Sequence, residues 1–272
     1  MTRPDQHNYA FYSRWFYKGL NQDIIVTSSR NIIKIVQEYI NFDSVIDIGC
    51  GTGQILRACS EAGAKTIRGV DGTWVDKNML VIPSECFTPS DISQPNLAEK
   101  IPEKKFDLTV SSEVAEHIDP EDCENYMNNL VSFSDVILFS AAIPGQGGTH
   151  HVNEQYPSYW IKKFEARGFI PVDCIRPVVW RDKNIRLDWR QNLVMFVRKD
   201  KLKNYPKLEA EAGRKVLDIV HPEFWGIWSY PPNIMKMSSR GPKRGTKNLL
   251  RELICFIPGF IYALKVRLFK HS

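Results

Sequence analysis

The amino-acid sequence predicts an α/β fold built on a mostly parallel sheet with helices on both faces. Three observations support this prediction. Short apolar segments alternate with helical ones, the first apolar segment runs into a glycine-rich turn, and two late apolar segments lie close enough to pair antiparallel. The chain has 272 residues, of which 43% are hydrophobic and 25% charged, as in a soluble globular protein with a sizeable core.

The predicted segments follow one another in a regular order. Residues 1–40 form an N-terminal helical region, since IIVTSSRNIIKIVQEYI has apolar residues at helical spacing. VIDIGCGTG is a buried strand that enters a glycine turn, and QILRACSEAGA continues as a helix that ends near Gly63. The next strands are expected in TIRGVD, SECFTPSDI, FDLTVS and DVILFSAAI. The helix PSYWIKKFEARG, with Gly168 as its C-cap, precedes the late strands in FIPVDCIRPVVW and QNLVMFVRK.

The chain is expected to divide into four regions. They are the helical region 1–40, a core at 41–200, a helical and aromatic linker at 201–233, and a basic amphipathic helical tail at 234–272. The tail has nine Lys or Arg and one acidic residue, a net charge of +8, whereas the rest of the chain has a net charge of −3. This asymmetry predicts an anionic partner for the tail, either a membrane surface or nucleic acid.

Within the tail, the segment LICFIPGFIYAL at 253–264 is uncharged and has Lys and Arg on both sides. It is too short to span a bilayer, so we expect a helix, kinked at Pro258, in the interface of an anionic membrane. A helix docked on the domain or on a second subunit is an alternative. An RNA-binding tail is another, although few aromatic residues are interleaved with the basic ones.

The expected location of the protein is the cytoplasm, with peripheral attachment to the inner face of the membrane through the tail. MTRPDQHNYA contains no apolar signal segment. The six cysteines are scattered and form no CxxC pair, which favours reduced thiols.

The most informative stretch is DIGCGTG at residues 47–53. Its glycines let the backbone turn tightly after the strand and approach a ligand closely. The spacing is GxGxG and differs from the GxGxxG of dinucleotide-binding proteins. Asp71 ends the next predicted strand, where a carboxylate can accept hydrogen bonds from two ribose hydroxyls, and Asp91 follows the third. These positions fall at the carboxyl ends of strands, where such sheets bind ligands.

These motifs resemble those of the class I S-adenosylmethionine-dependent methyltransferases. VIDIGCGTG resembles the first motif of that family, GVD its second-strand acid, SDI its adenine contact, and FDLTVSSEVAEHI its fourth-strand motif. The resemblance covers about Asn41 to Lys199 and implies a Rossmann-like seven-stranded sheet that binds S-adenosylmethionine and transfers its methyl group. A glycine turn in a nucleotide-independent domain and a dinucleotide oxidoreductase are the alternatives.

The resemblance also implies which residues contact the cofactor. The glycine loop would cradle the methionine part with the help of Asp47, Asp71 would hold the ribose, and Asp91 and Ile92 would lie along the adenine. Trp74 would cover the adenine or the ribose, unless it is a core residue. The implied set is Asp47, Gly49, Cys50, Gly51, Gly53, Asp71, Gly72, Trp74, Asp91, Ile92 and Ser112.

A second candidate site follows the fourth predicted strand, in VSSEVAEHIDP at 110–120. On a helical turn, Glu113, Glu116 and His117 would share one face, because they are spaced i, i+3 and i+4. His150 and His151 follow the fifth strand. Carboxylates and imidazoles together suit Mg²⁺, Mn²⁺ or Zn²⁺. A bound metal would lower the pKa of an acceptor hydroxyl, and His150 would accept the proton.

This arrangement resembles two branches of methyltransferases, the small-RNA 3′-end 2′-O-methyltransferases and the ubiquinone-pathway O-methyltransferases. In the first branch, two Glu and two His chelate a metal together with two vicinal ribose hydroxyls. The resemblance, with the HxxE pattern from His151 to Glu154, implies metal ligands at Glu113, Glu116, His117 and His151. Similar segments occur in metal-free methyltransferases, where His117 would support the loop and His150 or His151 would be the general base.

The expected acceptor is a sugar hydroxyl of a glycan or lipid-linked saccharide. HVNEQYPSYWIKKFEARGF and the late strands resemble methyltransferases of glycan and polysaccharide biosynthesis. The residues Trp180, Arg181, Trp189 and Arg190 suit a sugar or a phosphate-bearing acceptor, unless they serve ordinary packing. The alternatives are a small-molecule phenol or quinone-precursor O-methyltransferase, an RNA 2′-O-methyltransferase, and an RNA-binding module.

Overall fold

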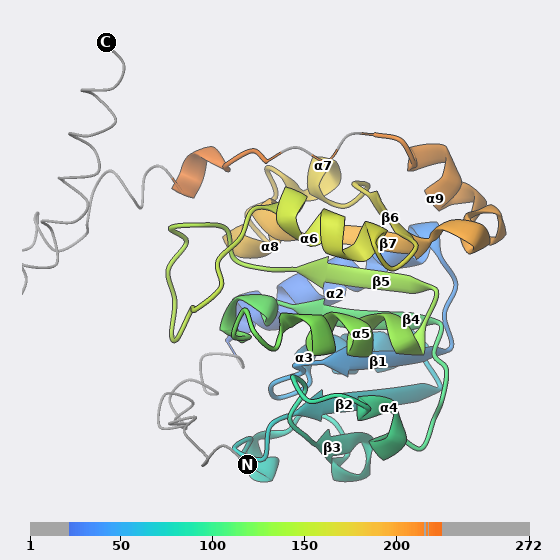
Figure 1. Ribbon diagram of the computed structural model, residues 1–272, viewed down its shortest axis with the longest axis vertical. Coiled ribbons are helices and arrows are strands. Elements are labelled where there is room, and N and C mark those ends of the chain that lie inside the picture. The colour runs from blue at the N-terminus through green and yellow to red at the C-terminus, as the bar shows by residue number, and fades with distance from the viewer. Residues whose placement is uncertain (1–21, 215, 217, 225–272) are drawn as a thin grey trace, which may run out of the picture. The chain divides into compact units, whose positions relative to one another are not determined.

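The computed structural model describes residues 22–214, 216 and 218–224 (Figure 1). Residues 1–21 of the expected N-terminal helical region, the end of the expected linker and the whole basic tail lie outside the described residues. Contacts within the chain divide it into one unit, Met1–Phe224, and a second, Trp225–Ser272. No helix in the described part is long and apolar enough to cross a membrane.

The described residues form one seven-stranded sheet in the order β3-β2-β1-β4-β5-β7-β6. The strands are β1 (Ser44–Ile48), β2 (Thr66–Asp71), β3 (Phe87–Pro89), β4 (Leu108–Ser112), β5 (Val136–Ser140), β6 (Phe169–Val172) and β7 (Val194–Arg198). The first five strands run parallel, and β7 pairs antiparallel with both β5 and β6. The mostly parallel sheet with a late antiparallel pair, predicted from the sequence, is therefore confirmed.

Helices cover both faces of this sheet, as expected. They are α2 (Asp23–Tyr39), α3 (Gln54–Glu61), α4 (Leu97–Lys100), α5 (Cys123–Phe133), α6 (Pro157–Glu165), α7 (Arg176–Val179), α8 (Leu187–Asn192) and α9 (Pro206–Glu211). Buried side chains of α2, α3, α7, α8 and α9 join one hydrophobic cluster, and those of α4, α5 and α6 join a second. The predicted strand FIPVDCIRPVVW is shorter than expected, because β6 ends at Val172 and Arg176–Val179 form helix α7.

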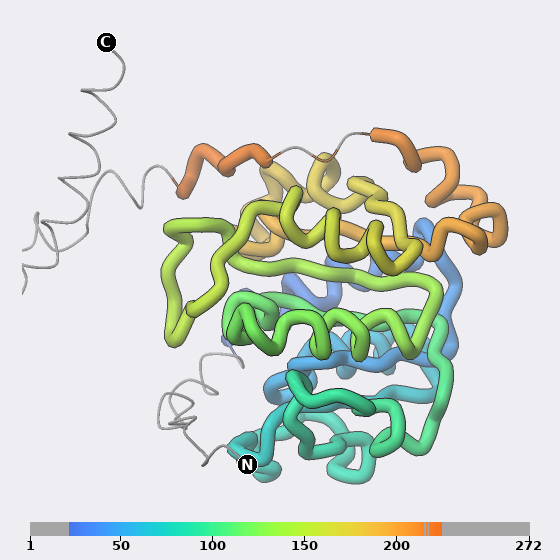
Figure 2. Tube along the Cα trace, viewed as in Figure 1, coloured from blue at the N-terminus to red at the C-terminus, as the bar shows by residue number. Residues whose placement is uncertain are grey.

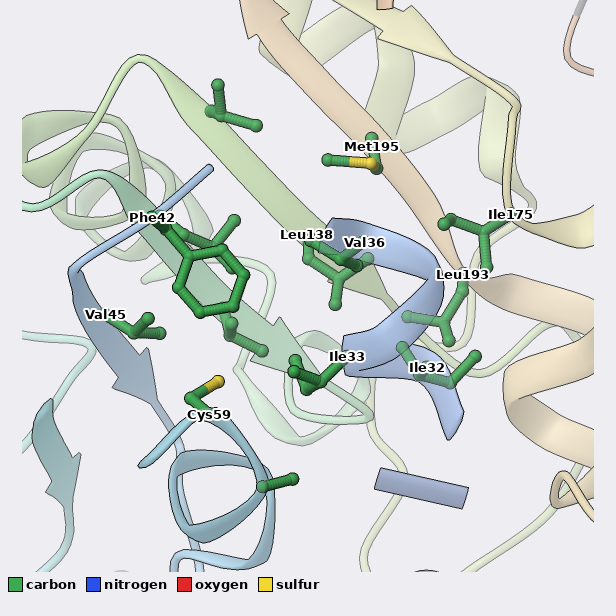
Figure 3. Packing of buried hydrophobic residues seen from close by; sticks show 14 of the residues in the cluster. Ile32, Ile33, Val36, Phe42, Val45, Cys59, Leu138, Ile175, Leu193 and Met195 are labelled. Atoms are coloured by element: carbon green, nitrogen blue, oxygen red, sulfur yellow. The ribbon is translucent and has the colours of Figure 1, made fainter. Parts of the chain in front are cut away.

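The strands divide their side chains between the two clusters. In β1, Val45 packs into the first cluster and Ile46 into the second, because successive residues of a strand point to opposite faces. Figure 3 shows Ile33 and Val36 of α2 packed close to Leu138 of β5 in the first cluster. Strands buried on both faces appear in the sequence as continuous apolar runs, which is why they were predictable.

An ion-pair cluster joins α5 to α6 on the surface. Glu124 accepts hydrogen bonds from Lys163 Nζ at 2.5 Å and from Arg167 Nη2 at 2.6 Å. These two cations lower the pKa of Glu124 to about 2. The folded-state pKa of Glu124 lies below the usual carboxyl pKa. The ion pairs therefore stabilise the fold fully at pH values above the usual carboxyl pKa, and this stabilisation is lost as the pH falls toward 2.

We predict that Glu124→Gln lowers the free energy of unfolding at pH 7 by about 1 kcal/mol or less, since the pair is exposed to solvent. Denaturant melts at a series of pH values measure this difference, which shrinks between pH 5 and pH 2 as the native Glu124 takes up its proton. Glu165→Gln is the matched control on exposed α6 surface and is expected to change little. An effect of Glu124→Gln that does not vary with pH would contradict the assignment.

Candidate active site

The glycine loop follows β1 and depends on backbone conformations that favour glycine. Gly49, Gly51 and Gly53 have φ angles of 87°, 54° and 89°. A Cβ atom on Gly49 would lie 2.3 Å from Val114 Cγ2, so this glycine also lets the loop touch the turn after β4. Cys50, between the first two glycines, is buried. The loop is therefore fixed by its backbone and by a close contact across two strands.

Asp71, at the end of β2, holds the glycine loop from the side. Its Oδ2 accepts a hydrogen bond from Gly51 N and its Oδ1 from Gly72 N, both at 2.7 Å. Burial raises the pKa of Asp71, and the two N–H groups act in the opposite direction. Trp74 packs over Gly72, where an added Cβ would lie 2.1 Å from the indole ring.

The other predicted cofactor residues lie at the same edge of the sheet. Asp47 in β1 is buried, and burial raises its pKa well above the usual value, with the charge of Asp71 as a second cause. Asp91 Oδ1 accepts hydrogen bonds from Ser93 N and Oγ in the loop after β3. Ile92 is held there because its carbonyl accepts from the Asn129 side chain at 2.9 Å.

The turn after β4 differs from the predicted helix. Only Ala115–His117 forms a single 3₁₀ turn, and Glu113 has a left-handed φ of 55°. The expectation that Glu113, Glu116 and His117 share one helical face was therefore wrong, because the chain changes direction at Glu113. Ser112, just before this reversal, shares a hydrogen bond with Ser140 Oγ at 2.9 Å.

The loop between β5 and α6 lies beside this turn, at the carboxyl edge of the sheet (Figure 2). The carbonyl oxygen of Glu116 accepts hydrogen bonds from Val152 N and Asn153 N, each at 2.9 Å. His117 Nδ1 lies 3.2 Å from the carbonyl oxygen of His150. These backbone contacts bring together two segments that are more than thirty residues apart.

As a result, Glu116, His117 and His151 place one potential ligand atom each within 4.8 Å of one another. The Glu116 side chain is fully buried, and among the described residues neither carboxylate oxygen makes a hydrogen bond of good geometry, although the backbone N–H groups of Glu116 and Ala142 are near enough to lower its pKa. Burial raises its pKa well above the usual value, and the charge of Glu113 adds to this. Burial also lowers the pKa of His117 to about 4, which keeps that imidazole neutral and able to bind a metal.

The ring of His151 is oriented by Glu154. His151 Nδ1 lies 2.9 Å from Glu154 Oε1, and the same carboxylate accepts hydrogen bonds from Gly145 N and Gly147 N at 2.7 Å. A carboxylate on Nδ1 leaves the other ring nitrogen for a ligand, as is common around metal-binding histidines. His150 is exposed and has a left-handed φ of 58°, so of the two histidines it is His151 that joins the cluster.

Glu113, a predicted metal ligand, lies outside this cluster. Its carboxylate accepts hydrogen bonds from Gln146 Nε2 at 2.7 Å and from Asn192 Nδ2 at 3.2 Å. Asn192 Nδ2 also donates to Gln146 Oε1 at 2.9 Å, so the three side chains form a closed ring of contacts. Burial raises the pKa of Glu113 to about 7, with the charge of Asp188 as a second cause.

The sequence did not single out Gln146 or Asn192. Glu113 and Asn192 are 79 positions apart, and neither amide stands in a recognisable motif. The only signal was the position of Gln146 in the loop that also carries the predicted histidines.

Of the residues proposed for acceptor contacts, two are committed to internal packing. Trp189 and Arg190 are both 4% exposed. The Arg190 guanidinium donates two hydrogen bonds to the Glu223 carboxylate, and Gln191 binds the backbone of Ile219 and His221 on either side. The segment 218–224 is thereby docked on α8.

Comparison with known proteins agrees with this geometry. Residues 24–141 match the sequence model of a family described as a methyltransferase domain. This part of the chain is therefore a methyltransferase domain, and the seven-stranded sheet has the Rossmann-like fold of S-adenosylmethionine-dependent methyltransferases. The predicted cofactor residues of this methyltransferase all lie along the carboxyl edge of its sheet, at the ends of β1 to β4.

Several solved methyltransferases have similar folds. One from Archaeoglobus fulgidus is 21% identical, covers 58% of this chain and 75% of its own, and has a TM-score of 0.45. A putative O-methyltransferase from Nostoc punctiforme is 14% identical over 67% of this chain and 58% of its own, with a TM-score of 0.49. The magnesium protoporphyrin IX methyltransferase from Synechocystis, with bound SAH, is 18% identical over 65% of this chain and 85% of its own, with a TM-score of 0.44. No curated protein sequence matches this methyltransferase.

We predict that Asp71→Ala weakens the binding of S-adenosylmethionine by at least about tenfold, because a charge-assisted hydrogen bond contributes about 1.5–3 kcal/mol. Isothermal titration calorimetry measures the dissociation constant, and thermal melting confirms that the variant is folded. Asp76→Asn is the control, since Asp76 caps the neighbouring turn Lys77–Met79 instead of the glycine loop. Unchanged affinity in a folded Asp71→Ala variant would refute the assignment.

Proposed function

We propose that this methyltransferase transfers the methyl group of S-adenosylmethionine to a hydroxyl of a sugar, in a glycan or a lipid-linked saccharide. We further propose that Glu116, His117 and His151 hold a divalent metal ion beside the acceptor. The observation that supports the metal is the Glu116 carboxylate, which is fully buried, has only nearby backbone N–H groups of Glu116 and Ala142 to stabilise its charge, and lies close to two imidazoles. A buried carboxylate is stable only when it is paired, protonated or bound to a metal.

The three proposed ligands, Glu116, His117 and His151, suit the smaller divalent metal ions. One carboxylate and two imidazoles are typical ligands of Mn²⁺ or Zn²⁺, and three protein ligands leave positions for a substrate. When bound, such an ion would lower the pKa of an acceptor hydroxyl and fix its direction relative to the methyl donor.

The charged groups beside the proposed metal site suit an acceptor that carries hydroxyls. The charge of Asp188 raises the pKa of both Glu113 and Glu116, and Arg186 lowers that of Glu113. Arg186 is itself bound by Asp188. Hydroxyls of an acceptor can donate hydrogen bonds to the carboxylates of this group.

The ring of Glu113, Gln146 and Asn192 supports a polyhydroxyl acceptor. Carboxylates and side-chain amides are the groups that hydrogen-bond sugar hydroxyls, and these three are held rigidly by one another. A planar phenol would need an apolar surface instead. In the proposed reaction the hydroxyl oxygen attacks the methyl carbon in line with the sulfonium sulfur, and its proton passes to His150, whose backbone adjoins the cluster.

The decisive experiment is a methyl-transfer assay with labelled S-adenosylmethionine and three acceptors, namely a methyl glycoside with a vicinal diol, a catechol and an RNA with a terminal vicinal diol. We expect transfer to the glycoside alone. A chelator should abolish it and Mn²⁺ or Zn²⁺ should restore it, while Glu116→Gln lowers it by about two orders of magnitude and removes bound metal from elemental analysis.

The matched control is Asp119→Asn, an exposed carboxylate two residues beyond the turn, which should keep both activity and metal. Methylation of the catechol or the RNA in preference to the glycoside would refute the proposal that the acceptor is a sugar hydroxyl. Full activity in the presence of chelator would refute the proposal that a metal ion takes part.

We also propose that the basic tail, residues 234–272, binds an anionic membrane. The proposal is supported by its net charge of +8 and its central apolar segment. The full chain should sediment with phosphatidylglycerol vesicles and not with phosphatidylcholine vesicles, and a chain ending at Gly241 should lose this binding. That truncation keeps the docked segment 218–224, so equal binding by the shortened chain would refute the role of the tail.

A further inference from the structure

Asn192, one member of the ring with Glu113 and Gln146, also lines a small cavity. Its walls come from β5, α6, β7 and the end of α8, and include Trp160 and Asn192. About 10 Å³ of it is open to the centre of a water molecule, which is room for one water. The rest of its lining is largely apolar, namely Phe139, Ala141, Pro157, Ile161, Val194 and Phe196.

Two buried polar atoms belong to residues that line this cavity. Trp160 Nε1 and Asn192 Oδ1 both lack a hydrogen-bond partner in the described part of the chain, and the two residues are 2% and 4% exposed. The indole nitrogen can only donate a hydrogen bond, and the amide oxygen can only accept one. Buried polar groups of this kind are nearly always satisfied, often by an internal water.

We propose that one water molecule occupies this cavity, accepts a hydrogen bond from Trp160 Nε1 and donates one to Asn192 Oδ1. The orientation of the Asn192 amide supports this. Its Nδ2 donates to Glu113 and to Gln146 Oε1, so the opposite atom, Oδ1, is the one left for the water. Turning the amide over would set its oxygen against the Glu113 carboxylate.

Trp160 is thereby a positioning residue for the acceptor side of the site. The water holds Asn192, and Asn192 holds both Glu113 after β4 and Gln146 in the loop after β5. Helix α6 would thus influence the site through a bound water and without touching the substrate. This role rests on the proposed acceptor site around Glu113 and does not depend on the metal or on the identity of the sugar.

The water is tested first, without any acceptor. The full chain is labelled with ¹⁵N-tryptophan, and Trp160→Phe identifies the indole signal of Trp160 by its loss. We expect this indole proton to exchange slowly and to show a cross-peak to a long-lived water. A slowly exchanging Trp160 indole proton with no water cross-peak would refute the proposed water site, even if the enzyme methylates the proposed acceptor.

The positioning role is tested by kinetics with whichever acceptor is methylated. Trp160→Phe should raise the acceptor KM by about fivefold, the equivalent of one hydrogen bond, and leave the KM for S-adenosylmethionine unchanged. Ile161→Val is the control, because it enlarges the same cavity without removing a polar group.

A double variant separates positioning from packing. In an Asn192→Leu background, Trp160→Phe should have no further effect on the acceptor KM, since the path through Asn192 is already broken. An equal effect in both backgrounds, or an equal effect of Ile161→Val, would overturn the role of Trp160 while leaving the proposed reaction standing.

Discussion

The close approach of Gly49 to Val114 is the constraint on which both halves of the site depend. Gly49 begins the loop that faces the cofactor, and Val114 lies within the turn that carries Glu113 and Glu116. With any side chain at position 49 the two segments would collide, and the positive φ would be strained as well. The glycine loop and the turn that carries Glu116 therefore meet because two strand ends, β1 and β4, can pack without a Cβ between them.

The site gathers buried and half-buried carboxylates at one edge of the sheet. Burial raises the pKa values of Asp47, Asp71, Glu113 and Glu116. Such a set is unfavourable for folding and is characteristic of a site that binds positive charge. S-adenosylmethionine carries a sulfonium cation, and its product after methyl transfer does not.

Much of this arrangement could be predicted from the sequence, because it depends on local signals. Apolar runs located the strands, and the glycine spacing with Asp71 located the cofactor side. The segment around Glu116 and the histidines after β5 were also identified, since they adjoin strand ends. The prediction failed where backbone direction mattered. A left-handed residue at Glu113 is not visible in a pattern of residue types, and Glu113 lies outside the cluster of Glu116, His117 and His151.

By itself the sequence determined the fold class, the order of the strands along the chain and the chemistry at their carboxyl ends, because periodicity and glycine spacing are properties of neighbouring residues. Only the tertiary structure decided which side chains act together. Glu116 meets His151 through backbone hydrogen bonds between distant loops, and Glu113 meets Asn192 across 79 positions. Trp160 and Asn192 line one cavity that exists only once α6 has packed on the sheet. These contacts arise from packing between elements, for which a single sequence carries no local signal.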